Sequence, residues 1–211
     1  QTITKQNPCG NESLKIESSG GTPESVIMGC MFICLGGFEI ATTAGAVTKT
    51  SWGAKILTPL NSPYKGYAFY NYGLLNVTNF FDKNPEFEFY LKLGDATAEQ
   101  PNEAWVTIGG TNGDYATAAY KKFGIHITTA MGLRIISSDG TTQTESDSLM
   151  TLSTSTLYRV RVKLDDSKIE VWVDSVSKGT KTTNLPSGDL LSNHACPQFI
   201  GLGDSDGQYS I

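Results

Sequence analysis

The stretch LYRVRVKLDDSKIEVWVD, Leu157 to Asp174, has the pattern of two β-strands joined by a tight turn at 165–167. Successive side chains of an extended chain point to opposite faces of a sheet, so residues two apart share an environment. The residues that alternate on the apolar face are Tyr158, Val160, Val162 and Leu164 in the first strand and Ile169, Val171 and Val173 in the second. This hairpin predicts a sheet with one face on a core and the other in water.

One aromatic residue of the hairpin, Trp172, falls on its charged face. Its ring can pack over neighbouring Arg and Lys side chains through cation–π contacts, or form an interface with another subunit. It can also be a platform on which a sugar ring stacks, while Arg159, Arg161 and Glu170 hydrogen-bond the hydroxyls. All three interpretations stay open. The third makes Trp172, Arg159, Arg161 and Glu170 the predicted ligand-binding residues.

Composition limits the class of protein that carries this hairpin. The chain has 211 residues, 39% of them hydrophobic and 18% charged, which is typical of a globular protein able to bury a core. A net charge of -5 without a basic block predicts no nucleic-acid partner. The longest apolar run, Val26 to Phe38, is shorter than the roughly 17 residues that span a bilayer, so no membrane span is expected.

Strand patterns recur along the chain, with turn signals between them. They include EFEFYLKL at Glu86–Leu93, AWVTI around Trp105, FGIHITT from Phe123 and GLRII from Gly132. We therefore predict an all-β fold, an antiparallel two-sheet β-sandwich, and a single domain over residues 1–211. Residues 1–60 are less regular, and we expect them to pack on this sandwich or on a neighbouring subunit.

Several segments, in order, resemble the concanavalin A-like jelly rolls, and particularly their laminin G-like branch. The matching segments are Gly66–Phe69, Phe87–Leu93, Leu157–Val162, Ile169–Asp174 and Phe199–Gly203. The resemblance covers the chain from about residue 64 onward. What it implies for function is limited, because jelly rolls of this kind host lectin-like and adhesion modules, glycoside hydrolases, polysaccharide lyases and virion proteins, so the site must decide.

Two features depart from the family pattern. The Asp-Gly that follows the second hairpin strand in the family is Asp174-Ser175 here, and only residues 208–211 follow the last matching loop, too few for a typical strand. An uncovered sheet edge invites strand addition. We therefore expect residues before Tyr64, with Ser13–Glu17 or Val26–Leu35 as candidates, to complete the sandwich or to reach into a neighbouring subunit. The second case would give a homo-oligomer assembled by strand exchange.

Catalytic patterns are weak. Glu86 and Glu88 have the spacing of a glycosidase carboxylate pair, but without a third acid or surrounding Trp residues they are better explained as a solvated charged face. A polysaccharide lyase needs His, Arg, Gln and Tyr around an acidic sugar, and His126 between two isoleucines does not supply that cluster. We expect that the protein is not an enzyme.

One acidic loop is a candidate metal site. Asp204 and Asp206 alternate with Ser205 between two glycines, and oxygen ligands in a flexible loop are what Ca²⁺ accepts. The alternative is a solvated turn. Ca²⁺ is the one cofactor that the sequence suggests.

These observations favour a non-catalytic, secreted β-sandwich module, extracellular or on a virion surface, that binds carbohydrate (a glycan) or a protein partner. The first alternative is a structural subunit of a capsid, fibre or surface appendage, which low charge and Thr-rich strands favour. The second is a glycoside hydrolase or polysaccharide lyase of the same fold.

Overall fold

The computed structural model describes residues 2–6, 13–17, 38–42, 46–50, 53–57, 64–70, 75–93, 103–110, 117–154, 156–192, 198–203 and 208–210. Side chains are described for residues 77–93, 103–110, 117–154 and 156–190. Regular structure in these residues is β apart from one 3₁₀ turn, Phe81–Lys83.

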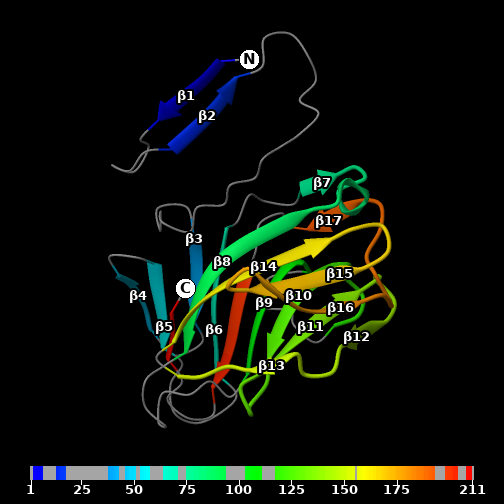
Figure 1. The fold of residues 1–211 in the computed structure, drawn as a ribbon. Coiled ribbons are helices and arrows are strands. Elements are labelled where there is room, and N and C mark those ends of the chain that lie inside the picture. The colour runs from blue at the N-terminus through cyan, green and yellow to red at the C-terminus, as the bar shows by residue number, and fades with distance from the viewer. Residues whose placement is uncertain are drawn as a thin grey trace.

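Two antiparallel sheets form the body of the molecule (Figure 1). Among the described residues the eight-stranded sheet has the order β12-β11-β10-β9-β18-β6-β3, with β13 also paired to β11. Its strands are β3 (Phe38–Thr42), β6 (Tyr64–Tyr70), β9 (Glu103–Gly109), β10 (Lys122–Ile127), β11 (Gly132–Ser138), β12 (Gln143–Glu145), β13 (Met150–Thr151) and β18 (Gln198–Gly203).

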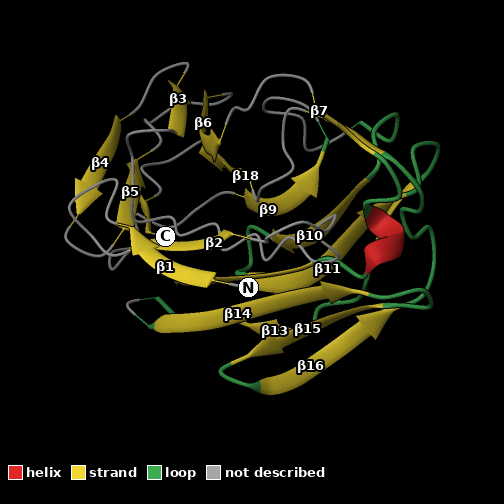
Figure 2. Ribbon diagram, turned by 90° about the horizontal axis from the view of Figure 1, so that it is seen from above, coloured by secondary structure: helices red, strands yellow, loops and turns green. Residues whose placement is uncertain are grey.

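The seven-stranded sheet has the order β16-β15-β14-β8-β19-β5-β4 in the same described part. Its strands are β4 (Ala46–Thr50), β5 (Gly53–Leu57), β8 (Glu86–Leu93), β14 (Leu157–Leu164), β15 (Ile169–Val173), β16 (Val176–Lys181) and β19 (Gln208–Ser210). Figure 2 shows β9, β10 and β11 in one layer and β14, β15 and β16 in the other. Two further pairs are separate: β1 (Thr2–Gln6) with β2 (Ser13–Glu17), and β7 (Leu75–Val77) with β17 (Leu190–Ser192).

The predicted fold class and the predicted hairpin are confirmed. Strands β14 and β15 pair antiparallel around the Asp165–Ser167 turn, with Val162 opposite Val171 and Arg161 opposite Trp172. Strand β8 shows the expected alternation, since its four apolar residues are buried and its two glutamates are exposed. The period-two pattern therefore identified both the strands and the faces they bury.

Aromatic rings join the two sheets. Phe87 of β8, in the seven-stranded sheet, lies with its ring centroid 5.6 Å from that of Phe123 of β10, in the eight-stranded sheet, at an interplanar angle of 61°. Phe81 of the 3₁₀ turn contacts Phe123 edge-on at 6.3 Å, and Phe89 stacks on Phe87 at 5.9 Å. Offset and edge-on arrangements of this kind add to the stabilisation from burial alone. The core therefore forms between the inner faces of the two sheets.

The end of the chain differs from the sequence prediction. Residues 208–210 do form a strand, β19, which pairs with both β5 and β8. The prediction that too few residues remained for a strand is therefore wrong, because three residues suffice when both neighbours hydrogen-bond to them. Strands β3, β4 and β5 also precede Tyr64 and belong to the two main sheets.

The two candidates for completing the sandwich have different outcomes. Ser13–Glu17 is a strand, β2, but it pairs with β1 rather than with either main sheet. Val26–Leu35 lies outside the described residues. The packing of residues 1–60 as one part of a single domain, and strand exchange with another subunit, stay predictions.

The replacement of the family's Asp-Gly by Asp174-Ser175 keeps the geometry of a two-residue hairpin turn. Asp174 and Ser175, which connect β15 to β16, have φ angles of 51° and 67°. Positive φ at both central residues is the two-residue hairpin conformation in which Asn-Gly and Asp-Gly are favoured. The Asp174 Oδ1 atom accepts a hydrogen bond from the Arg159 amide at 3.0 Å, which ties the turn to β14.

Replacement of Phe123 by Ala should test the aromatic contact between the sheets. Phe123 is completely buried, so Phe123→Ala should lower the free energy of unfolding by about 3–5 kcal/mol, as measured by chemical denaturation. Tyr90→Ala is the matched control, because Tyr90 is 51% exposed on β8 and surface changes stay within roughly 0.5 kcal/mol. Equal losses for the two variants would contradict this account of the core.

Candidate functional site

Strand β10 is buried on both faces. Phe123, Ile125 and Ile127 point into the core, so His126 lies on the outer face of the eight-stranded sheet. The strand register places Trp105 of β9 and Arg134 of β11 directly opposite His126 on either side. Residues opposite each other on adjacent strands share a face. A row of three polar or aromatic side chains therefore crosses the centre of this outer face.

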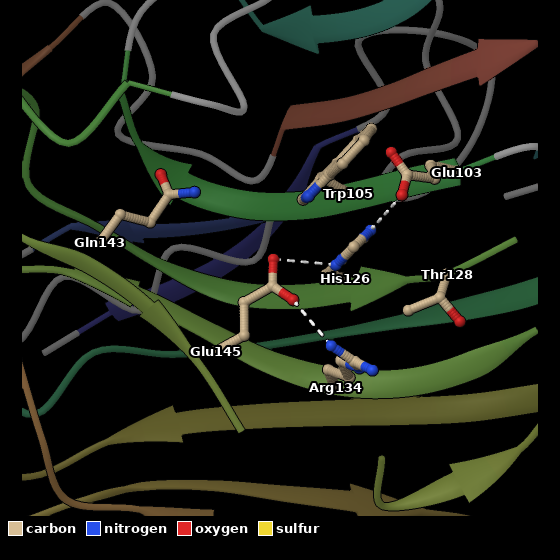
Figure 3. Close-up of a pocket in the computed structure, with 7 residues that line it drawn as sticks. All are labelled: Glu103, Trp105, His126, Thr128, Arg134, Gln143 and Glu145. Carbon is tan, nitrogen blue, oxygen red and sulfur yellow. Dashed lines mark hydrogen bonds and ion pairs between the residues drawn. The ribbon is translucent and has the colours of Figure 1, made fainter. Parts of the chain in front are cut away.

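A pocket of about 530 Å³ opens over this row (Figure 3). Its size lies within the roughly 300–1,000 Å³ typical of small-molecule sites. The residues that line it come from β9, β10, β11 and β12 and from the residue after β10: Glu103, Trp105, His126, Thr128, Arg134, Gln143 and Glu145. Four of the seven are acidic or basic residue types. The pocket is therefore suited to a hydrogen-bonding ligand rather than to an apolar one.

The imidazole of His126 is held from three sides. Its ring stacks on Trp105, with 4.5 Å between the centroids and an interplanar angle of 6°. Glu145 Oε1 lies 2.9 Å from Nδ1, and Glu103 Oε1 lies 3.7 Å from Nε2, so two carboxylates flank opposite edges of the ring (Figure 3). Trp105 and His126 are only 3% and 5% exposed. The stacking fixes the ring plane, and the carboxylates face its two nitrogens.

Glu145 connects the imidazole to a guanidinium. Its Oε2 atom accepts a hydrogen bond from Arg134 Nη1 at 3.4 Å. Burial alone would raise the pKa of Glu145, but the contacts with His126 and Arg134 outweigh it and hold the pKa below its ordinary value of 4.5. The charge of Glu145 also partly offsets the effect of burial, which lowers the pKa of Lys181 on β16. Glu145 is therefore a persistent negative charge at the pocket.

Several polar atoms of the pocket are buried without a well-aligned partner. Among the described residues, Arg134 Nε and Gln143 Oε1 are buried without a hydrogen-bond partner, and the two ring nitrogens of His126 face the carboxylates of Glu145 and Glu103 at 2.9 Å and 3.7 Å without an aligned hydrogen bond. Buried polar groups are normally paired, and one left unpaired costs about 1–3 kcal/mol. These atoms are hardly accessible to solvent, so a ligand would first meet the exposed parts of the pocket, such as the Arg134 side chain, which is 40% exposed.

The residues predicted from the sequence lie on the opposite side of the sandwich. Trp172 and Arg161 are cross-strand neighbours on the outer face of the seven-stranded sheet, and the guanidinium carbon of Arg161 lies 4.8 Å from the Trp172 ring centroid. Glu170 accepts hydrogen bonds from Lys168 at 2.6 Å and from Ser177 at 2.7 Å. The cation–π interpretation of Trp172 is therefore the one that the side chains display.

The arginines of this face are paired with glutamates. Arg161 makes two hydrogen bonds to Glu86, both at 2.7 Å, and Arg159 donates to Glu88 at 2.8 Å. Glu86 and Glu88 are thus members of an exposed ion-pair network, as the solvated-face interpretation predicted. A sugar bound by Arg159 or Arg161 would have to compete with these carboxylates.

The predicted metal ligands, Asp204 and Asp206, lie outside the described residues. Within the part of the chain that the structure describes, no three His, Cys, Asp or Glu side chains are grouped so as to hold a metal ion. The described residues also contain no helix long and apolar enough to cross a membrane.

Sequence reasoning missed the pocket because it considered His126 alone. The strands around Phe123 and Gly132 were both identified, and a short turn between them fixes the pairing of His126 with Arg134. Reading these two strands as a hairpin would have placed the imidazole and the guanidinium side by side. The contribution of Gln143 and Glu145 could not be found this way, because β12 is only three residues long.

Comparison with known proteins gives a fold but no family. Neither a family model nor a curated protein sequence matches the chain. The Ca²⁺-bound exoplasmic/lumenal domain of VIP36 is similar in structure, with a TM-score of 0.55, 14% identity, and coverage of 83% of this chain and 81% of that one.

Two carbohydrate-active enzymes are also similar in structure. A glycosidic hydrolase has a TM-score of 0.55 and 12% identity, and the match covers 84% of this chain and 88% of that one. The endo-β-1,4-glucuronan lyase of the fungus Trichoderma reesei has a TM-score of 0.51 and 14% identity, with coverage of 82% and 84%. These likenesses confirm the concanavalin A-like jelly-roll fold, which is shared by proteins of different function.

Replacement of Glu145 by Gln should have a pH-dependent effect on stability. A carboxylate whose pKa is lower in the folded than in the unfolded protein stabilises the fold above its unfolded pKa, and this contribution is lost as pH falls through the folded pKa. Glu145→Gln should therefore destabilise the protein at pH 7, and the difference from wild type should shrink below the ordinary value of 4.5. Urea denaturation of both proteins at pH 7 and at a pH below 4.5 measures this difference in the free energy of unfolding.

Asp166→Asn removes a carboxylate from the exposed β14–β15 turn and should change stability little at pH 7. A Glu145→Gln effect of the same size at low and neutral pH would show that the Glu145 charge contributes nothing to the fold.

Proposed function

We propose that this chain is a non-catalytic, glycan-binding β-sandwich module whose ligand binds in the pocket around His126. The observation that carries the proposal is the pocket of about 530 Å³, whose lining combines the stacked rings of Trp105 and His126 with the partly exposed guanidinium of Arg134 and carboxylates from Glu103 and Glu145. Each sugar hydroxyl both donates and accepts hydrogen bonds, so a few hydroxyls can satisfy such a mixed set. The jelly-roll fold is consistent with this function, since the exoplasmic/lumenal domain of VIP36 in its Ca²⁺/Man-bound form has a similar structure.

This site replaces the Trp172 face as the first choice for the ligand. The charged groups of Arg161, Arg159 and Glu170 are already satisfied by protein partners. A ligand on that face would compete with short hydrogen bonds, such as the two of 2.7 Å between Arg161 and Glu86, whereas Arg134 in the His126 pocket meets Glu145 at 3.4 Å. The Trp172 face stays available as a surface for a protein partner, since aromatic and Arg residues are favoured anchors of interfaces.

The remaining features of this proposal follow from the sequence and the fold together. We propose that the protein works outside the cell or on a virion surface, and the similar fold of the exoplasmic/lumenal domain of VIP36 is consistent with a place outside the cytoplasm. Within the jelly rolls we assign it to the laminin G-like branch on the segment matches described above. Ca²⁺ binding by Asp204 and Asp206 is part of the proposal, as is the alternative role as a structural subunit of a capsid, fibre or appendage.

Substitutions in the pocket should weaken glycan binding. Arg134→Met keeps the aliphatic part of the side chain but removes the guanidinium, and His126→Gln keeps a polar group of similar length. Each should weaken binding to the best ligand on a glycan array by at least tenfold, the effect of about 1.4 kcal/mol. Asp166→Asn should bind as wild type does. Loss of binding in Trp172→Ala, with the pocket variants unaffected, would instead place the ligand on the seven-stranded sheet.

A second candidate function, polysaccharide cleavage, is favoured by one observation. His126, Arg134 and Gln143 line one pocket, so three of the four residue types expected of a lyase centre are brought together. The fourth type, Tyr, occurs two strands away from Trp105 in the same sheet. Tyr67 of β6 is opposite Ile200 of β18, and Ile200 is in turn opposite Trp105 of β9. This arrangement weakens the sequence argument against an enzyme, which treated His126 as isolated.

Incubation with neutral and acidic polysaccharides distinguishes the candidates. A binding module should release no reducing ends and produce no ultraviolet absorbance from an unsaturated sugar, even at high protein concentration. Activity that is present in wild type and lost in His126→Gln would establish the enzyme instead. A preparation of the His126→Gln variant made in parallel controls for contaminating hydrolases.

A further inference from the structure

The pairing of Arg134 with Glu145 limits the charge that a ligand can carry. We infer that the pocket is selective for uncharged sugars and rejects uronates, and that Glu145 is the residue that determines this selectivity. The inference rests on the proposed function, since it concerns the ligand of the same pocket. It names a class of ligand, neutral hexose chains, and assigns a role to one carboxylate.

The hydrogen-bonding groups of the pocket match hydroxyls better than a carboxylate. Arg134 Nε is a buried donor and Gln143 Oε1 a buried acceptor, and neither has a partner among the described residues. A hydroxyl group can pair with both kinds of atom, whereas an ionised carboxylate only accepts. At C6, a uronate therefore offers an acceptor to Arg134 but no donor to Gln143 Oε1, whereas the hydroxyl of a neutral hexose offers both.

The guanidinium of Arg134 is also already in contact with a carboxylate. Glu145 Oε2 accepts from its Nη1 at 3.4 Å, so a uronate approaching Arg134 would be close to a second negative charge. Glu145 stays ionised at neutral pH, because its contacts with His126 and Arg134 lower its pKa. The uronate would have to displace Glu145 or be repelled by it.

The other polar groups around Glu145 do not remove this constraint. His126 on β10, the cross-strand neighbour of Arg134, lies 2.9 Å from Oε1, whereas Arg134 contacts Oε2. Lys181 on β16 is buried, donates to Thr183 Oγ1 at 2.7 Å, and is not among the residues that line the pocket. Arg134 is thus the arginine or lysine that lines the described part of the pocket, and the carboxylate of Glu145 lies against its guanidinium.

Glu145→Gln provides a direct test, because glutamine keeps the size and the acceptor oxygen but removes the charge. With Glu145 neutral, Arg134 gains the capacity to bind an anionic sugar. The variant should therefore change the ligand preference rather than simply weaken binding. A merely structural role for Glu145 predicts equal weakening for all ligands.

The probes are tetrasaccharides that differ only in the oxidation state of C6: β-1,4-linked glucose against β-1,4-linked glucuronate, and β-1,4-linked mannose against β-1,4-linked mannuronate. Affinities are measured by calorimetry at low salt and pH 7. Wild type should prefer the neutral member of a bound pair by at least tenfold. In Glu145→Gln the ratio should move toward the uronate by at least fivefold, and Glu145→Gln/Arg134→Gln should lose this gain.

Asp166→Asn is the matched control. It changes the net charge by the same amount, but in the exposed turn between β14 and β15 of the other sheet. It should leave the ratio unchanged, which separates local charge from the general repulsion of an anion by a protein of net charge -5.

The outcomes distinguish the inference from the proposed function. If wild type prefers a uronate, or if Glu145→Gln leaves the ratio unchanged while neutral sugars bind, the inference is overturned and the glycan site stands. If neither wild type nor the variant binds any of the four probes, although both unfold cooperatively, the proposed function fails and the inference with it.

Discussion

The contact between Phe87 and Phe123 determines which face of the eight-stranded sheet can bind a ligand. These rings join the sheets at 5.6 Å, so the alternate residues Ile125 and Ile127 of β10 also point inward. The residue between them, His126, must then point outward. Because the strand register fixes its neighbours, Trp105 and Arg134 are brought to it without any loop of special conformation. The pocket is therefore built on rigid strands.

Charged side chains are paired differently on the two outer faces, and this difference supports our proposal that the ligand binds on the eight-stranded sheet. On the seven-stranded sheet, Arg159 and Arg161 are paired with Glu88 and Glu86 at short distances, in an exposed network that contributes little to stability. On the eight-stranded sheet, His126 is nearly buried and its nitrogens lack aligned partners. A fold tolerates unpaired buried groups at a cost, and such costs concentrate at sites of function.

Sequence reasoning was accurate where one strand determines the outcome. The alternation in β8, β14 and β15 identified the strands and their buried faces, because the period of two is a property of a single extended chain. It also placed Trp172 correctly on the charged face but could not show that Arg161 covers the ring. The pocket needed four strands in register, and the position of the short strand β12, which brings Gln143 and Glu145, is set by tertiary pairing with β11. The short closing strand β19 was missed for the same reason.

The ion pair between Arg134 and Glu145 is better explained by specificity than by stability. Partly buried pairs gain little after desolvation, and apolar side chains would cover this part of the sheet at lower cost. Glu145, however, contacts the guanidinium with one oxygen and approaches the imidazole with the other, so one side chain orients two ligand-facing groups. It also reduces the positive charge that a lyase would need to stabilise an acidic sugar. The carboxylate that we propose as a selectivity residue of a glycan site therefore argues against the lyase chemistry that His126, Arg134 and Gln143 would otherwise suggest.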